Sequence, residues 1–230
     1  MKKSIFMVAL LLGAATTSFA QKANLENPFS FEGAMNLAGG GVTWEAPSVR
    51  ARYFVNDNIA VRATLGLGDG LGTPRSESYT YTDTSGTGSS EITRLAWNAS
   101  IGAEYHLDGT DRLSPYFSAA IGFGGGSYDE EWTNANGDAG IYVDGLSATR
   151  DGGYSMFGFQ IGAGLDIYLI DNLYCGVELG IGFSSMSFDP TNQTVTTAAG
   201  TETSILQEAN SMSFIGTGAG NASIRFGWRF

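Results

Sequence analysis

The sequence FGFQIGAGLDIYL, residues 157–169, alternates between apolar side chains and small or polar ones. Its odd positions, from Phe157 to Leu169, hold only apolar residues, and its even positions hold mainly glycine and polar residues. Because successive side chains of a β-strand point to opposite faces, this period of two predicts a strand with one apolar face. The pattern resumes over residues 173–184 after a turn that contains Asp171 and Asn172, so the two segments predict an antiparallel hairpin.

The same period of two extends over the rest of the chain. It predicts six further strands, over residues 28–38, 48–55, 59–67, 94–106, 115–124 and 212–230. The connections alternate between short turns (56–58, 107–114 and 170–172) and long loops (39–47, 68–93, 125–153 and 189–211). We therefore expect an all-β fold, an eight-stranded antiparallel up-and-down barrel that occupies residues 28–230 as a single domain.

The N-terminal segment has the features of a secretory signal peptide. Lys2 and Lys3 precede an apolar run at residues 5–15, and small residues lead to a cleavage site after Ala20. We expect residues 1–20 to be removed after export and residues 21–27 to form a short periplasmic lead-in. Loss of the two lysines changes the net charge from −11 to −13.

The composition excludes several classes of function. The 230 residues include 12 Lys and Arg against 23 Asp and Glu, so the protein repels phosphate backbones and no nucleic-acid partner is expected. The sequence has one histidine, His106, and one cysteine, Cys175, which are too few for a multi-histidine or thiolate metal site. We expect neither a metal nor a cofactor.

The residues on the polar face distinguish a soluble barrel from a membrane barrel. A soluble barrel would expose a face rich in Lys and Glu, but here this face is dominated by glycine, serine, alanine, asparagine and threonine. The apolar face carries no charge and many aromatic residues, among them Trp97, Phe117 and Phe159. Such a face contacts lipid in transmembrane barrels, so we expect the small residues to fill the lumen.

The last predicted strand carries the most specific motif. Phe226, Trp228 and Phe230 lie on one face of it, and Phe230 is the last residue of the sequence. In this respect the chain resembles the small bacterial outer-membrane barrels formed by OmpX and by the membrane domain of OmpA. The resemblance implies that Phe226, Trp228 and Phe230 form an assembly signal read by the barrel-assembly machinery.

The same resemblance implies a location in the bacterial outer membrane, among its lipids and lipopolysaccharide. The two termini and the short turns would then face the periplasm, and the long loops would lie outside the cell. We expect a monomer. Aromatic residues near the inner rim are expected to form an interfacial belt, made of Phe29, Tyr53, Tyr105, Tyr116, Tyr168, Tyr174 and Trp228.

Charged residues at the strand positions predicted to point into the lumen lie near the short turns. Most of them lie three to six residues from a turn or a chain end, which predicts one layer of charges in the lumen. They are Glu32, Arg50, Arg52, Arg62, Glu104, Asp166, Glu178 and Arg225, with Arg229 nearby. An eight-stranded barrel is only wide enough for side chains, so these charges must pair. We hypothesise an arginine–carboxylate plug that closes the lumen, and the alternative is a gate that opens for ions.

Two functions remain open. The long loops carry −12 of the −13 charges, which favours a closed barrel that displays acidic extracellular loops for structural, adhesive or partner-binding roles. The alternative is a small gated pore, or a lateral-diffusion transporter for ions or small apolar molecules. His106 points inward at the turn end, away from the outer rim where lipid-modifying barrels of similar architecture place a histidine. We therefore expect no catalytic residues and no enzymatic activity.

Overall fold

Antiparallel β-structure makes up most of the described chain. A computed structural model describes residues 26–38, 41–67, 75–216 and 222–230. The twelve strands form one sheet: β1 (Phe29–Ala38), β2 (Gly41–Phe54), β3 (Ile59–Leu67), β4 (Arg75–Thr82), β5 (Thr87–His106), β6 (Leu113–Asn136), β7 (Ile141–Ile170), β8 (Leu173–Phe188), β9 (Thr191–Thr197), β10 (Gly200–Gln207), β11 (Asn210–Gly216) and β12 (Ala222–Arg229). None of the described residues forms a helix long and apolar enough to span a membrane. The signal peptide predicted at residues 1–20 and most of the predicted lead-in lie outside the described residues.

Eight of the described strands pair in a closed circuit. From β1 it runs through β2, β3, β5, β6, β7 and β8 to β12, and β12 pairs with β1, always antiparallel. In the β1–β12 register, Ser30 lies opposite Arg229. Main-chain hydrogen bonds between Phe29 and Phe230, 3.0 and 3.2 Å long, complete this junction. Strands that pair in a closed circuit leave no free sheet edge at that level.

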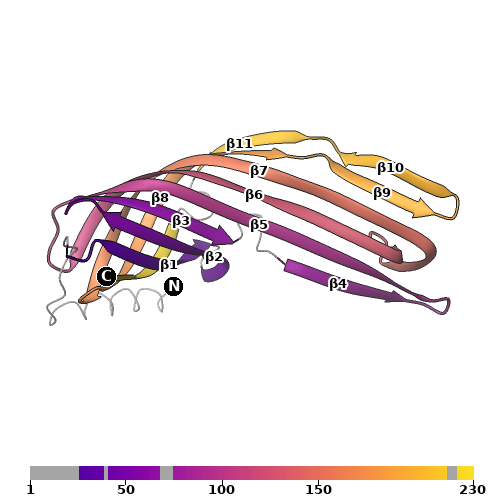
Figure 1. The fold of residues 1–230 in the computed structure, drawn as a ribbon, viewed down its shortest axis with the longest axis horizontal. Coiled ribbons are helices and arrows are strands. Elements are labelled where there is room, and N and C mark those ends of the chain that lie inside the picture. The colour runs from indigo at the N-terminus through magenta and orange to yellow at the C-terminus, as the bar shows by residue number, and fades with distance from the viewer. Residues whose placement is uncertain (1–25, 39–40, 68–74, 217–221) are drawn as a thin grey trace.

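Short turns lie at the end of the molecule that holds the C-terminus (Figure 1). Between β2 and β3, the side chain of Asn56 accepts a hydrogen bond of 2.8 Å from the main-chain N–H of Ile59. Between β7 and β8, Asn172 has a φ of 68°, which asparagine tolerates better than most residues. The main-chain N–H of Arg229 donates to the carbonyl of Asn172 (2.8 Å), and this bond ties the last strand to the turn.

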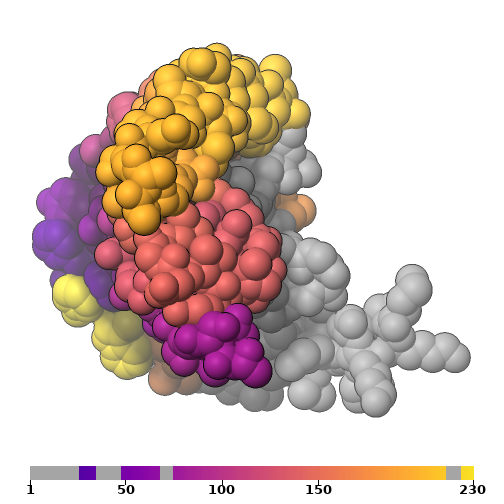
Figure 2. Space-filling view, turned by 90° about the vertical axis from the view of Figure 1, so that its right-hand side faces the viewer, coloured from indigo at the N-terminus to yellow at the C-terminus, as the bar shows by residue number. Residues whose placement is uncertain are grey.

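Beyond the closed circuit, β5, β6 and β7 continue as a long sheet on one side of the molecule (Figure 1). These three strands have 20, 24 and 30 residues, whereas β3 has 9. β4 pairs with β5, β9 pairs with the outer part of β7, and β10 pairs with β9. We call this part of the sheet, with its three hairpins, the extension. Figure 2 looks onto its far end, where the β4–β5, β6–β7 and β9–β10 hairpins lie in a row.

The prediction of long loops over residues 39–47, 68–93, 125–153 and 189–211 was therefore wrong for most of the residues that the structure describes there. These segments contain the first part of β2, which begins at Gly41 and pairs with β1, together with β4, β9, β10 and the outer parts of β5, β6 and β7. In the extension, polar residues predominate on both faces of the strands, and apolar ones such as Trp132 and Ile205 are scattered, so these strands lack the alternation that marks the others. Cross-strand threonine pairs stabilise the β9–β10 hairpin instead. The hydroxyl oxygens of Thr194 and Thr203, and those of Thr196 and Thr201, lie 3.0 Å apart across β9 and β10.

The segment predicted as one strand over residues 212–230 forms two. β11 pairs with the outer half of β8, from Asn210 opposite Phe188 to Gly216 opposite Gly182, and β12 pairs with the inner half. Residues 217–221, between these two strands, lie outside the described residues. With β4, β9, β10 and β11, the sheet described here has twelve strands where eight were predicted.

The two faces of the closed circuit differ in chemistry. Apolar side chains on the odd positions of β3, β5, β7 and β8 point outward, and Leu65, Ile161 and Leu179 expose 62%, 58% and 65% of their surface. Side chains of the other parity, such as Arg52 and Glu104, are buried inside. Few soluble monomers leave so extensive an apolar surface uncovered.

Three of the aromatic residues predicted for the interfacial belt lie inside the barrel. Tyr116, Tyr168 and Tyr174 are buried, because each occupies the inward parity of its strand. Their nearness to the short turns predicted that they belong to the interfacial belt. The alternation within each strand, however, decides whether a side chain points outward or into the lumen. The other four are exposed on the outer face: Phe29, Tyr53, Tyr105 and Trp228.

Candidate functional site

The inward-facing charges form one cluster near the short turns. Seven strands contribute to it, and cross-strand register aligns its members, since Glu32 lies opposite Arg50 and Arg52 lies opposite Arg62. No member exposes more than 7% of its surface. The lumen cluster, as we call it, contains all eight residues predicted for the lumen: Glu32, Arg50, Arg52, Arg62, Glu104, Asp166, Glu178 and Arg225.

Arg52 and Arg225 share two carboxylates. Nη1 of Arg52 donates to Asp166 Oδ2 (2.8 Å) and to Glu104 Oε2 (2.9 Å). Its Nε lies 2.7 Å from Glu32 Oε1. Arg225 donates through Nη1 to Glu32 Oε2 and through Nη2 to Asp166 Oδ1, both at 2.9 Å. The planar guanidinium group suits such multiple contacts, which hold β1, β2, β5, β7 and β12 together.

Glu178 of β8 binds the other two arginines. Arg62 Nη1 donates to Glu178 Oε2 (2.9 Å) and to Glu104 Oε1 (3.2 Å). Arg50 Nη1 also donates to Glu178 Oε2, at 2.9 Å. Because Glu104 contacts both Arg62 and Arg52, the lumen cluster is a single network in which four positive charges face four negative ones.

Two tyrosine hydroxyls extend this network. Tyr174 donates to Glu32 Oε1 (2.6 Å). Tyr116 donates to Glu178 Oε2 (2.7 Å) and accepts a hydrogen bond from Arg225 Nη2 (2.5 Å). Both residues were predicted for the lipid interface, so this role was missed. The signal that would have found them is their inward parity at the level of the charged residues.

Glycines opposite these rings provide the space that the rings fill. A Cβ atom added at Gly164 would overlap the ring of Tyr116, and one added at Gly227 would overlap the ring of Tyr174. Gly176 is similarly close to the side chains of the lumen cluster. Part of the glycine excess in the barrel strands therefore has a packing cause.

His106 links Ser114 to the lumen cluster. Its Nδ1 lies 2.8 Å from Ser114 Oγ, and its Nε2 lies 3.1 Å from Glu104 Oε2. The ring packs between Phe54 and Tyr116, with centroid distances of 5.1 Å to each. His106 and Ser114 are completely buried, so the serine hydroxyl is enclosed by protein. The sequence predicted an inward histidine but not its contact with Ser114.

An apolar layer lies between the lumen cluster and the short turns. Its buried residues are Phe54, Ala60, Tyr168 and Tyr174. The guanidinium carbon of Arg229 lies 4.7 Å from the centroid of the Phe54 ring, and Arg229 Nη2 donates to the carbonyl of Asn27 (2.6 Å). Paired charges and aromatic rings therefore fill this end of the barrel.

Phe226, Trp228 and Phe230 lie on the opposite side of the wall. They are 49%, 48% and 62% exposed on the outer face of the last strand. Their alternation with Arg225 and Arg229, which are buried inside, directs them away from the lumen cluster.

A smaller ion-pair group lies in the extension. Arg150 of β7 donates to Asp138 Oδ2 (2.7 Å), and its Nη1 is 3.5 Å from Glu130 Oε2. The guanidinium carbon stands 5.1 Å from the ring centroid of Trp132. The hydrogen bonds to Asp138 raise the pKa of Arg150 above its ordinary value. This group joins β6 to β7 well outside the closed circuit.

No family model and no curated protein matches the chain. Among solved structures, it is similar to the N-terminal β-barrel domain of OprF from Pseudomonas aeruginosa, at 17% identity and a TM-score of 0.39, over 88% of this chain and 96% of that one. It is also similar to the outer membrane protein OprG from Pseudomonas aeruginosa, at 15% identity and a TM-score of 0.45, over 93% and 99%. A major outer membrane protein from Thermus thermophilus is similar at 13% identity and a TM-score of 0.38, over 88% and 98%.

Proposed function

We propose that the chain is a transmembrane barrel of the bacterial outer membrane, whose eight circuit strands cross the bilayer. Support comes from the exposed apolar side chains on the outer face and from the lengths of the shortest strands. β3 and β12 have 9 and 8 residues. About 9–11 residues of a tilted strand span the hydrocarbon core. The short strands therefore set the height of the membrane band, and the extension lies beyond it.

In this proposal the short turns and the C-terminus face the periplasm, and the extension faces the outside. This is the usual arrangement of outer-membrane barrels. Phe226, Trp228 and Phe230 would then face lipid and serve as the signal for the barrel-assembly machinery. The acidic surface of the extension would lie above the lipopolysaccharide.

The observation that carries the functional proposal is the filling of the lumen. The lumen cluster joins seven strands, its members are almost completely buried, and the apolar layer of Phe54, Ala60, Tyr168 and Tyr174 lies below it. An ion that crossed the barrel would have to separate buried ion pairs, and breaking such pairs is costly. The barrel would thus be a closed support for the extension, which it presents for structural, adhesive or partner-binding roles.

Planar-bilayer recordings test whether the lumen is closed. We expect no steady conductance from the chain refolded in lipid. The double variant Arg62→Ala with Glu178→Ala should conduct, because it removes two large side chains and two opposite charges from the lumen cluster. The control, Arg75→Ala with Glu77→Ala, removes an ion pair of β4 and should remain closed. Large, steady channels in the unmodified chain would overturn the proposal in favour of a gated pore.

A further inference from the structure

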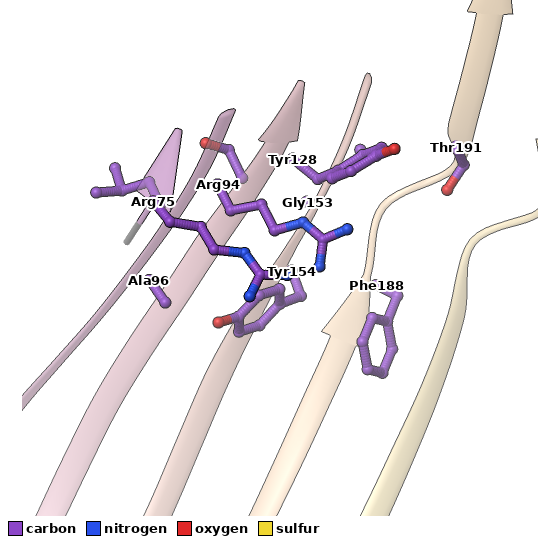
Figure 3. Close-up of a pocket in the computed structure, with 11 residues that line it drawn as sticks. Arg75, Arg94, Ala96, Tyr128, Gly153, Tyr154, Phe188 and Thr191 are labelled. Carbon is purple, nitrogen blue, oxygen red and sulfur yellow. The ribbon is translucent and has the colours of Figure 1, made fainter. Parts of the chain in front are cut away.

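A pocket of about 320 Å³ lies where the closed circuit gives way to the extension (Figure 3). β3 ends at Leu67, which lies opposite Trp97 of β5, and the pocket begins at the next residue along β5, Ala96. Residues of β4 to β9 line it, and none of them belongs to the lumen cluster. The pocket is therefore a separate feature at the mouth of the barrel.

Two arginines lie next to each other in this pocket. Arg75 of β4 is directly opposite Arg94 of β5, and Figure 3 shows both side chains extending toward the side of Tyr154 and Phe188. Like charges directly opposite each other on neighbouring strands destabilise a sheet. Arg75 has Glu77 at 3.5 Å, but half of its side chain remains exposed. In a chain with a net charge of −11, this pair concentrates positive charge at one place.

Aromatic rings form the other side of the pocket. Tyr154 of β7 and Phe188 of β8 have ring centroids 6.0 Å apart. Tyr128 of β6 lies opposite Arg94, and the guanidinium carbon of Arg94 is 5.0 Å from the centroid of this ring. Thr191 adds a hydroxyl group. The pocket therefore combines cationic donors with flat apolar surfaces.

A nearby acidic side chain is already engaged. Glu130, two residues beyond Tyr128 on β6, accepts a hydrogen bond from the Tyr128 hydroxyl and lies 3.5 Å from Arg150. Its charge is thus balanced by Arg150. Arg75 keeps its ion pair with Glu77, so a bound carboxylate would share the half-exposed Arg75 with Glu77.

We propose that this pocket binds a small aromatic carboxylate. The carboxylate would accept hydrogen bonds from Arg75 and Arg94, whose planar donor groups match its geometry. The ring would pack among Tyr128, Tyr154 and Phe188. Ligand pockets hold about 300–1,000 Å³, and one of about 320 Å³ suits a ligand of one or two rings. Binding would also relieve the repulsion between the two arginines. The site does not depend on whether the lumen cluster closes the barrel.

Calorimetric titration of the full chain, refolded in detergent micelles, tests this site with three probes. 2-Naphthoate supplies both the rings and the charge, 2-naphthamide supplies the rings alone, and inorganic phosphate supplies charge alone. We expect 2-naphthoate to bind about tenfold or more tightly than either of the others. Equal affinity for 2-naphthamide would overturn the role of the arginines, and equal affinity for phosphate would overturn the role of the rings.

Variants assign the binding to the pocket. Arg94→Gln and Arg75→Gln should each weaken 2-naphthoate binding by about tenfold or more, and Tyr154→Ala should weaken it through loss of the ring. Arg112→Gln, in the short turn between β5 and β6 at the opposite end of the circuit, removes an arginine far from the pocket and should leave the affinity unchanged. Arg75 is half exposed on β4, outside the closed circuit, so Arg75→Gln provides a test even if Arg94→Gln fails to fold. Full affinity in the Arg75→Gln variant would overturn the proposal.

Discussion

Arg225 occupies a position where three buried groups converge, namely Glu32, Asp166 and Tyr116. Arg225→Met keeps much of the apolar volume but leaves two buried carboxylates without this partner. We expect the free energy of unfolding to fall by about 3–5 kcal/mol, as when one partner of a buried ion pair is removed. Urea unfolding from lipid vesicles measures it. Arg75→Met is the control, because its exposed ion pair should contribute no more than about 1 kcal/mol. Equal losses of unfolding free energy in Arg225→Met and Arg75→Met would contradict the role of Arg225 as a buried ion-pair partner.

The hydroxyl of Tyr116 should contribute separately. Tyr116→Phe leaves the ring in place, but Glu178 loses a donor and Arg225 loses an acceptor inside the barrel. We expect a loss of about 1–3 kcal/mol in the free energy of unfolding. Tyr105→Phe is matched in chemistry but exposed on the outer face, so it should have little effect. A neutral Tyr116→Phe would show that its hydrogen bonds do not stabilise the barrel.

The residues of the lumen cluster could be predicted from the sequence, but their partners could not. Parity assigns Glu32 and Arg225 to the lumen, and distance from the turns assigns them to one level. Glu32 pairs with Arg225 across 193 positions of sequence, and that choice depends on how the strands are staggered when the barrel closes. The nearness of Tyr116 to a turn predicts the lipid interface, which is wrong, because the position of Tyr116 in the alternation of β6 directs its side chain into the lumen.

At the scale of the strands, glycines lie opposite the buried tyrosines. Gly164 of β7 is opposite Tyr116 of β6, and Gly227 of β12 is opposite Tyr174 of β8. Gly164→Ala and Gly227→Ala should each displace a buried ring and lower the free energy of unfolding by about 1–3 kcal/mol. Gly33→Ala on β1 is the control, because an added Cβ there meets no atom within 4 Å. Urea unfolding of the three variants in lipid vesicles gives the comparison. Equal stability of the three would mean that the rings move aside freely.

The apolar period of two in the sequence does not identify the strands of the extension. The apolar period of two arises where one face meets lipid and the other meets the lumen, so it identifies the strands of the closed circuit. In β9 and β10 both faces meet solvent, and polar residues occupy both: Thr194 and Thr203 lie on one face, and Gln193 and Ser204 lie on the other. Their pairing depends on threonine side chains and main-chain hydrogen bonds, which leave no apolar alternation in the sequence.

For the molecule as a whole, the same strands serve the barrel and the extension. β5, β6 and β7 pass without interruption from the level of the lumen cluster to the far hairpins (Figure 1). The pocket of Arg75 and Arg94 lies at the level where the shorter β3 ends, so most of its walls belong to long strands that are anchored below, whereas Arg75 and Thr191 belong to the short strands β4 and β9. A pocket held in this way is expected to keep its shape when empty, which favours affinity.

The position of the membrane band is open to a direct test by charge substitution on the outer face. Ile101 of β5 is 55% exposed and lies opposite Ala63, the middle residue of β3, so Ile101→Arg would place a charge at the centre of the proposed band. We expect it to lower the free energy of unfolding in lipid vesicles by about 2–4 kcal/mol. Ile205 of β10 is 53% exposed in the extension, and Ile205→Arg should change stability by less than about 0.5 kcal/mol. If the outer face met water, both substitutions would be equally harmless. A cost confined to Ile101 is therefore expected only if the closed circuit, and not the extension, is surrounded by lipid.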